Sequence, residues 1–270
     1  MRFRLNALLG APIVAGLVGI AVLAAFWTPY SPTATRIRSR LQPPSSTHWL
    51  GTDEFGRDVL SRLMDGALVS FRVAFATMVF AIVVGTLVGI VSGFLRGWPD
   101  RLMMMVNDAL LAFPGILLAL ALMVILGPGQ ASIVLALGIA YTPSVVRVVR
   151  GQVLSLRERE FIEASRMIGN ADGYTMLRHV LPNCAAPISV LATSMFGWAV
   201  LSESALSFLG LGVPPPAATW GNMLSAARGY METAAWLSIA PGLCIALTLL
   251  GVNLLGDSLR DRLDPRMTIR

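Results

Sequence analysis

The chain has 270 residues, of which 55% are hydrophobic and 13% are charged, and its mean hydropathy is +0.70. This composition is too apolar for a soluble core of ordinary size and predicts an integral membrane protein. All 21 basic residues are arginine, which excludes a phosphate-binding-loop lysine, a Schiff-base lysine and a lysine general base.

The formal net charge of +6 does not indicate a nucleic-acid partner. The arginines are spread over loops between apolar runs and form no basic face interleaved with aromatic residues. Membrane lipid with anionic headgroups and a partner protein are therefore the expected counterparts. Cys184 and Cys244 lie in or beside apolar segments, where they are interpreted as small buried hydrophobes, with no disulfide or metal cluster predicted.

The first apolar run predicts a membrane helix at about residues 5–27, long enough to cross about 30 Å of hydrocarbon. A cleaved signal peptide is the alternative interpretation. The run is longer than the usual apolar region of such peptides, about 7 to 15 residues, and lacks a clear small-x-small exit. We therefore expect a retained span.

The rest of residues 1–69 predicts an extracytoplasmic loop, because it is polar and interrupted by four prolines. Its compact stretch from His48 to Arg62 contains three carboxylates, Asp53, Glu54 and Asp58. One histidine among carboxylates that already have arginine neighbours is typical of a capped, ion-paired loop. No metal site is predicted here.

Residues 70–256 predict the membrane core, with a second span at about 73–95. Gly85, Gly89 and Gly93 fall four apart on one face of this helix. Glycines at that spacing let another helix approach closely, and close packing is what holds helices together in lipid. This face is therefore expected to be a packing surface.

The third span is expected at about 102–126, with Asn107 and Asp108 near its start and Pro114 bending it. A tight Gly-Pro-Gly turn at residues 127–129 then returns the chain into a fourth span at about 131–148.

Arg147 and Arg150 stand at the end of the fourth span. They are expected to reach toward the lipid headgroups there.

The segment from Glu163 to Pro182 is polar and separates two apolar runs. Gly169 is expected to close a first short helix in the left-handed conformation, and Asp172 to cap a second. Pro182 should stop or kink that second helix. Ion pairs from Glu163 to Arg159 and Arg166 would support the first helix. The prediction is a compact projection at the membrane surface.

The fifth span, about 183–208, carries Glu203 in an apolar context, where an ionised carboxylate costs about 2.5 to 3.5 kcal/mol. Glu203 is therefore a candidate for the translocation path, together with Asn107 and Asp108. A structural hydrogen bond near the outer interface is the alternative for Glu203. After a proline-rich loop, a sixth span at about 234–255 leads to a cytoplasmic tail, 257–270.

Six spans place both termini on the same side of the membrane, and the arginine distribution predicts that this side is the cytoplasm. Residues 157–182 then also face the cytoplasm. The first outer loop is nevertheless richer in arginine, from Arg36 to Arg72, than this rule predicts.

Four segments carry a family resemblance. Glu163 to Pro182 resembles the Glu-Ala-Ala signature of bacterial importer permeases, the membrane halves of ATP-binding-cassette transporters, although His179 replaces the usual aliphatic residue. The GTDEFGRDVLSR, SFLGLG and NLLGDSLRDRLDPR stretches, which begin at Gly51, Ser207 and Asn253, are similar to segments of the shorter permease of dipeptide, oligopeptide and nickel importers.

This resemblance implies an all-α fold of six transmembrane helices, the type I importer permease, in a bacterial inner membrane. It implies a second permease subunit, two ATP-binding subunits that hold ATP and Mg, and an extracytoplasmic substrate-binding protein. The coupling residues would be Glu163, Ala164, Ser165 and Gly169. Peptides, glutathione, nickel and metallophore complexes are the implied substrate classes.

Two other function classes fit these residues less well. An ion-coupled secondary transporter or channel usually needs several ionisable groups within the membrane, and only Glu203 and Asp108 qualify here. An intramembrane hydrolase would need a histidine in a span, and His48 and His179 both lie outside the predicted ones. We therefore expect no enzyme activity in this chain.

Overall fold

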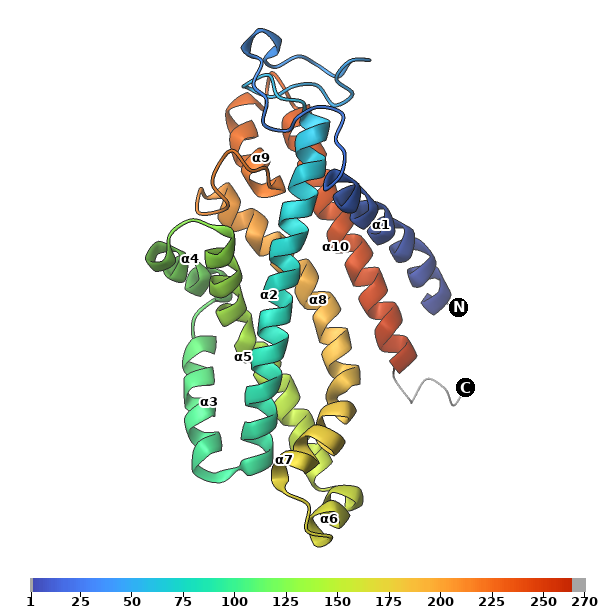
Figure 1. Ribbon diagram of the computed structural model, residues 1–270, viewed down its shortest axis with the longest axis vertical. Coiled ribbons are helices and arrows are strands. Elements are labelled where there is room, and N and C mark those ends of the chain that lie inside the picture. The colour runs from blue at the N-terminus through green and yellow to red at the C-terminus, as the bar shows by residue number, and fades with distance from the viewer. Residues whose placement is uncertain (1, 264–270) are drawn as a thin grey trace.

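The structure, a computed structural model, describes residues 2–263 as a helical bundle (Figure 1). The long helices are α1 (Arg2–Ala24), α2 (Val59–Leu95), α3 (Gly97–Leu111), α4 (Gly115–Leu126), α5 (Gln130–Arg157), α8 (Leu181–Phe208) and α10 (Trp236–Leu263). The short ones are η1 (Ile37–Ser39), α6 (Glu160–Met167), α7 (Asp172–Thr175), η2 (Met176–Val180), α9 (Trp220–Ala227) and η3 (Arg228–Tyr230).

Apart from α4, which lies across it, the long helices run roughly along the long axis of the molecule, and its two ends carry different structures (Figure 1). α2 packs along α5 and α8, while α1 packs on α10. The loop between α1 and α2 lies at one end with α9, and α6 and α7 lie at the opposite end. This separation agrees with the sides predicted for the first loop and for residues 157–182.

Within residues 2–263, five helices are long and apolar enough to cross a membrane: residues Asn6–Ala24, α2, α5, the continuous helix Asp172–Phe208, and α10. The pair α3 and α4 makes a sixth span if its two halves are counted together. The all-α membrane fold is thus confirmed.

The third span is not the single bent helix that was predicted for 102–126. α3 and α4 meet at an angle of 92°. Pro114 lacks an N–H and disfavours helical geometry in the residue before it, so it stands outside both helices, as the N-cap of α4. The 12 residues of α4 reach about 18 Å, well short of the hydrocarbon thickness.

Several helices extend beyond the apolar runs that predicted them. α2 begins at Val59 instead of residue 73 and is about 55 Å long. α5 continues to Arg157, and α10 continues to Leu263 through the first half of the predicted tail. Residues 264–270 of that tail lie outside the described residues.

Arg147 and Arg150, which were expected to reach toward headgroups, pair with acidic side chains of α3. Both acceptor oxygens of Asp100 lie 2.7 Å from Arg150, one from Nε and one from Nη2. Arg147 Nη2 lies 2.8 Å from Asp108 Oδ1. These two ion pairs hold α3 along α5.

The glycine face of α2 is a packing surface, as predicted, and its partner is α5 of the same chain. A Cβ built on Gly85 would lie 2.5 Å from Val145 Cβ. A Cβ on Gly89 would lie 2.8 Å from Val149 Cβ, and one on Gly93 would lie 2.9 Å from Val153 Cβ. Real Cβ atoms do not approach so closely, so the three glycines allow the two backbones to lie in contact.

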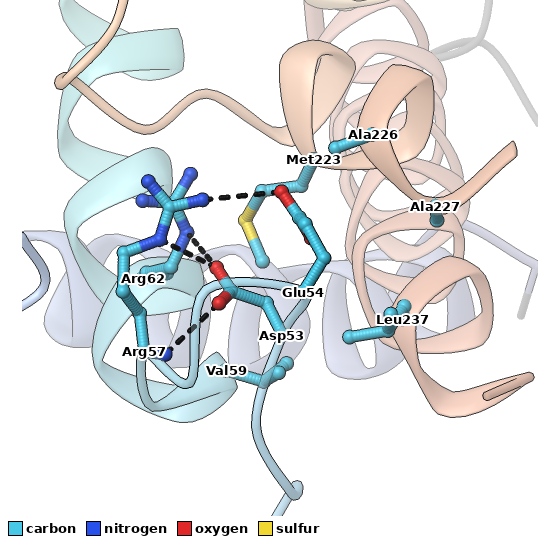
Figure 2. A pocket seen from close by; sticks show the side chains of 9 residues that line it. All are labelled: Asp53, Glu54, Arg57, Val59, Arg62, Met223, Ala226, Ala227 and Leu237. Atoms are coloured by element: carbon cyan, nitrogen blue, oxygen red, sulfur yellow. Dashed lines mark hydrogen bonds and ion pairs between the residues drawn. The ribbon is translucent and has the colours of Figure 1, made fainter. Parts of the chain in front are cut away.

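The loop before α2 is capped and ion-paired, as its sequence predicted. Asp58 is the N-cap of α2: its Oδ2 accepts from the Ser61 N–H at 2.8 Å, and its Oδ1 lies 2.8 Å from His48 Nδ1. Arg57 Nε donates to Asp53 Oδ2 at 2.6 Å, and Arg62 Nε lies 3.3 Å from the same oxygen (Figure 2).

Candidate functional site

The projection formed by α6 and α7 is the candidate site, and short connections hold it to the bundle. Two residues, 158 and 159, separate α5 from α6. α7 continues through η2 into α8 as one helix. Arg157 Nη1 donates to the Phe94 carbonyl, and Arg96 Nη2 donates to Glu158 Oε1 at 2.8 Å. The base of α6 is therefore tied to the end of α2 as well.

α6 ends in the glycine cap that the sequence predicted. Gly169 has φ +83°, in the left-handed region. Its N–H donates to the Arg166 carbonyl at 3.0 Å, and the Asn170 N–H donates to the Ser165 carbonyl at 3.2 Å. This pair of bonds is the Schellman motif, which satisfies the last carbonyls of the helix and reverses the chain.

The second helix differs from its prediction in its cap, and of the two outcomes predicted for Pro182, a stop or a kink, the stop does not occur. The N-cap of α7 is Ala171, and Asp172 stands in the first turn without a capping hydrogen bond. Pro182 does not stop the helix: η2 is one turn of π-helix, and Pro182 follows it in the first turn of α8. The wider turn places the proline where its missing N–H and its ring are accommodated.

The expected ion pairs of Glu163 are also absent from the described residues, because Arg166 turns elsewhere. Arg166 Nε lies 3.8 Å from Asp172 Oδ1. Its guanidinium lies over the Phe94 ring, 4.6 Å from the centroid. Arg166 thus links α6 to α7 and to the end of α2, and leaves the carboxylate of Glu163 exposed.

One face of α6 is fixed to the rest of the protein. Ile162 is fully buried in a cluster with Val153 and Val180. The Ser165 hydroxyl lies 3.0 Å from Thr175 Oγ1 and accepts from Asn170 Nδ2 at 3.1 Å. Of the four predicted coupling residues, Ser165 is therefore internal, whereas Glu163, Ala164 and Gly169 are exposed.

The outward face of the projection is apolar, a feature that the sequence reasoning did not identify. Met167 is 80% exposed, Ile168 77% and Phe161 43%, and Tyr174 and Leu177 are also exposed. Positions 161, 164 and 168 lie on one side of a helix, so helical spacing around Ala164 could have indicated this face. Exposed apolar groups gathered in one place are typical of surfaces that contact another protein or a membrane.

Comparisons with known proteins identify the family. Residues 85–269 match the model of the family described as "binding-protein-dependent transport system inner membrane component". The chain belongs to this family. It is a membrane permease subunit of the ATP-binding-cassette importers.

Similar permeases cover nearly the whole chain. A putative peptide transport system permease of Brucella suis biovar 1 is 43% identical over 97% of this chain and 88% of its own length. The dipeptide transport system permease of Alkalihalophilus pseudofirmus is 44% identical over 97% and 86%. The glutathione transport system permease of Escherichia coli O6:K15:H31 is 42% identical over 98% and 89%.

A solved structure shows the same fold. The inward-facing methionine ABC transporter MetNI has a chain that superposes with a TM-score of 0.62 at 19% identity, over 75% of this chain and 96% of that one. This likeness concerns the fold alone.

The three candidate path residues of the permease lie in different surroundings. Asn107 is 4% exposed on α3, and Asp108 is exposed and paired with Arg147. Glu203 on α8 has no exposed surface. The structure thus does not bring the three together, and a role for them in the translocation path stays a prediction.

Glu203 joins three helices of the permease. Its Oε2 accepts from Ser70 Oγ on α2 at 3.0 Å, and its Oε1 accepts from Ser207 Oγ on α8 at 2.7 Å. The Trp220 N–H at the start of α9 lies 3.5 Å from the same Ser70 oxygen. This arrangement fits the structural alternative, a buried carboxylate that positions α9 against the bundle.

We expect Glu203→Ala to destabilise the permease and Glu203→Gln to preserve both stability and transport. The alanine variant leaves buried serine hydroxyls without an acceptor, at a cost of about 1–3 kcal/mol. Glutamine keeps one acceptor, and a rotated hydroxyl can accept from its amide. Thermal unfolding of the purified complex and peptide uptake by vesicles measure the two effects. Loss of uptake in a stable Glu203→Gln complex would show instead that the charge itself serves transport.

Proposed function

We propose that this permease supplies half of the translocation path of an ATP-driven importer of small peptides, and that α6 and α7 dock an ATP-hydrolysing subunit. The observation that carries this proposal is the projection itself: a rigidly capped helix with an exposed apolar face, at the end of the molecule opposite the long loop. That geometry suits a helix that is received in a groove of another protein.

The connections of the projection make it a lever. α5 is continuous from Gln130 to Arg157 and meets α6 after two residues. On the other side of the projection, α7 continues directly into α8. Packed helices transmit a displacement because their cores resist compression. Movement of α6 would therefore pass to α5 and α8, and through the glycine face to α2.

Within this proposal, ATP and Mg bind to the partner subunits. This chain has no lysine for a phosphate-binding loop. A second permease would complete the path, and an extracytoplasmic protein would deliver the substrate. Both termini and the projection would face the cytoplasm of a bacterial cell, as the arginine distribution predicts.

Small peptides are the proposed substrates because relatives at 42–44% identity carry the names of peptide, dipeptide and glutathione transport systems. Glutathione is itself a tripeptide, so the three names share one substrate chemistry.

Reconstitution tests this function. The permease is purified with its partner subunits, placed in vesicles, and supplied with labelled dipeptides, glutathione or nickel, with ATP or an imposed ion gradient. We expect peptide to accumulate when ATP is supplied, without any need for an imposed ion gradient. Accumulation driven by the ion gradient without ATP would establish a secondary transporter instead.

We expect single cysteines at Ser45 and Gly229 to react with an impermeant thiol reagent from outside the cell, and one at Asn170 only after permeabilisation. All three sites are at least partly exposed, whereas Thr219, at the outer end of the bundle, is buried and would report nothing. Cys184 and Cys244 are first replaced by alanine. Labelling of the Asn170 site in intact cells would reverse the proposed orientation.

A further inference from the structure

A hollow lined by aromatic rings lies where the segment after α1 meets the start of α2. Its volume is about 400 Å³, within the range of about 300–1,000 Å³ that ligand pockets occupy. Trp27, Tyr30 and Trp49 line it, and the two tryptophans are 55% and 68% exposed. The polar residues of its lining are Ser46, Thr47 and Asp58. We call this site the aromatic hollow.

The rings of the aromatic hollow stand on a backbone that is held in place. The Tyr30 N–H donates to Ser61 Oγ of α2 at 3.0 Å, and the Tyr30 hydroxyl donates to the Thr47 carbonyl at 2.8 Å. The Tyr30 ring packs on His48, with 4.8 Å between the centroids. His48 Nδ1 in turn lies 2.8 Å from Asp58 Oδ1. The hollow is therefore formed before any ligand arrives.

The aromatic hollow lies at the depth of lipid headgroups. The apolar segment Asn6–Ala24 has 19 residues and a length of about 28 Å, close to the thickness of the hydrocarbon. Trp27 follows it by three residues, and its N–H still donates to the Leu23 carbonyl at 2.8 Å. Leu237, near the start of α10, packs with Val59 at the start of α2, so these helix ends lie at one level. Tryptophan and tyrosine are enriched at this boundary.

The hollow also stands at the lipid-facing edge of the bundle. α1 lies at that edge in Figure 1, and its apolar segment is 17% buried, against 28% or more in the other four spans. Ile20 and Leu23 are 42% and 46% exposed and lie on the face of α1 that leads to Trp27. The acyl chains of a lipid whose headgroup filled the hollow would run along this face.

The charge of the hollow is negative. Asp53 and Glu54 are paired with arginines, as Figure 2 shows, whereas the partner of Asp58 is His48. A neutral imidazole supplies a hydrogen bond and leaves the carboxylate charge in place. Arg36 lines a smaller neighbouring hollow with Asp58, but no ion pair joins them among the described residues. Aromatic faces attract cations as well. Together these groups suit an ammonium ion.

We propose that the aromatic hollow binds the ammonium-bearing headgroup of a phospholipid, such as phosphatidylethanolamine. The ammonium group packs against the tryptophan faces, above the buried Asp58, and the hydroxyls of Ser46 and Thr47 are available to the phosphate. The bound lipid would join the end of α1 to the start of α2. A peptide also carries an ammonium group, but the depth of the hollow and its position beside α1 favour a lipid. This inference does not depend on the proposed import of peptides.

The first test measures which lipid stays with the assembled importer. The complex is released from nanodiscs that hold equal amounts of phosphatidylethanolamine and phosphatidylglycerol with the same acyl chains, and its lipids are counted by native mass spectrometry. We expect Trp49→Leu to lower the ratio of the first lipid to the second about fivefold, because it removes a cation–π contact and keeps an apolar side chain. Trp49→Tyr should retain most of the ratio. Trp98→Leu, an equally exposed position on α3 at the opposite end, is the matched control.

The second test locates the lipid, and it uses the absence of lysine from this chain. Cys184 and Cys244 are replaced by alanine, Ser46→Cys is added, and a short reagent that joins a thiol to a primary amine is applied to vesicles that contain phosphatidylethanolamine. We expect a lipid adduct on the peptide that carries residue 46, at several times the yield found with Gly229→Cys. Gly229 is the matched control, because it is exposed and open and lies in η3, whose Tyr230 packs with Val59.

Each result decides for or against the proposal. Equal yields at the two cysteine sites, or an unchanged lipid ratio in Trp49→Leu, would overturn it. A dipeptide added outside the vesicles that is joined to residue 46 in place of the lipid would assign the hollow to the substrate. Peptide uptake is measured on the same complexes, so a complex that retains the lipid and imports nothing would count against the proposed function alone.

Discussion

Replacing Gly89 by leucine is expected to prevent the permease from folding into its bundle. A Cβ added at this position would lie 2.8 Å from Val149 Cβ and 3.0 Å from the Val146 carbonyl oxygen. Leucine adds three further carbons where two helix backbones touch. Overpacking a well-filled core typically costs about 1–3 kcal/mol, and here the clash with a backbone carbonyl leaves the side chain no alternative position.

Fluorescence-detected size-exclusion chromatography and uptake by cells measure this effect. Gly16→Leu is the matched control, because Gly16 lies in α1 with nothing within 4 Å of a Cβ; it should assemble normally. Gly89→Ala should have an intermediate effect, and adding Val149→Gly should restore part of the loss by returning room to the facing helix. Normal assembly of Gly89→Leu would mean that α2 and α5 do not pack as described.

The close α2–α5 contact could be predicted in part from the sequence. Glycines four residues apart require that some backbone comes near, since no other residue type leaves that space. The sequence did not reveal which helix fills it. That information depends on the valines at 145, 149 and 153, and β-branched residues at this spacing are ordinary in any apolar helix.

Helix boundaries were the least predictable feature, because charged side chains at the helix ends are paired across the fold. α2 extends through Arg62 because Asp53, in the preceding loop, neutralises it, and because Asp58 caps the first turn. α5 extends past Arg150 because Asp100 on another helix binds that guanidinium. Hydropathy indicates where a helix enters the membrane. It does not indicate where the helix ends when its charged residues beyond the membrane are paired with other parts of the fold.

Two prolines show the same limit of prediction from sequence. Pro114 separates α3 from α4 at 92°, whereas Pro182 continues a helix after a π-helical turn. Each proline removes one donor and restricts the preceding residue. Whether the chain breaks or adapts is decided by the tertiary packing around it, here including the buried Val180 two residues before Pro182.

At the candidate site, backbone requirements were predictable and side-chain partners were not. Gly169 has the left-handed conformation that a glycine after a short polar helix indicates. Ser165, by contrast, turned out to be buried against Thr175, ten residues further along the chain. Only folding of the projection decides which members of the Glu-Ala-Ser triplet face outward.

Gly169→Val and Glu163→Lys are expected to leave the permease inserted and to uncouple it from ATP hydrolysis. A β-branched residue at φ +83° costs about 1–2 kcal/mol in the left-handed region, and the strain is relieved by turning α7 away from α6. Nothing lies within 4 Å of a Cβ at Gly169, so the effect would come from backbone strain and not from a clash with another residue. Glu163→Lys reverses an exposed charge beside the apolar face. A partner surface whose positive charge matches the Glu163 carboxylate would then face a like charge.

Co-purification of the ATP-hydrolysing subunits, and the ratio of peptide imported to ATP hydrolysed, measure the coupling in these variants. We expect each to lower one of these quantities about tenfold; a tenfold weaker affinity for the ATP-hydrolysing subunits corresponds to about 1.4 kcal/mol of docking free energy. Gly169→Asn and Gly173→Val are the matched controls: asparagine tolerates the left-handed conformation, and Gly173 has open space in a helical position. Both should remain coupled, since neither strains the backbone. A Gly169→Val, Glu163→Lys double variant that binds its partners and imports peptide at the native rate would remove α6 from the coupling mechanism.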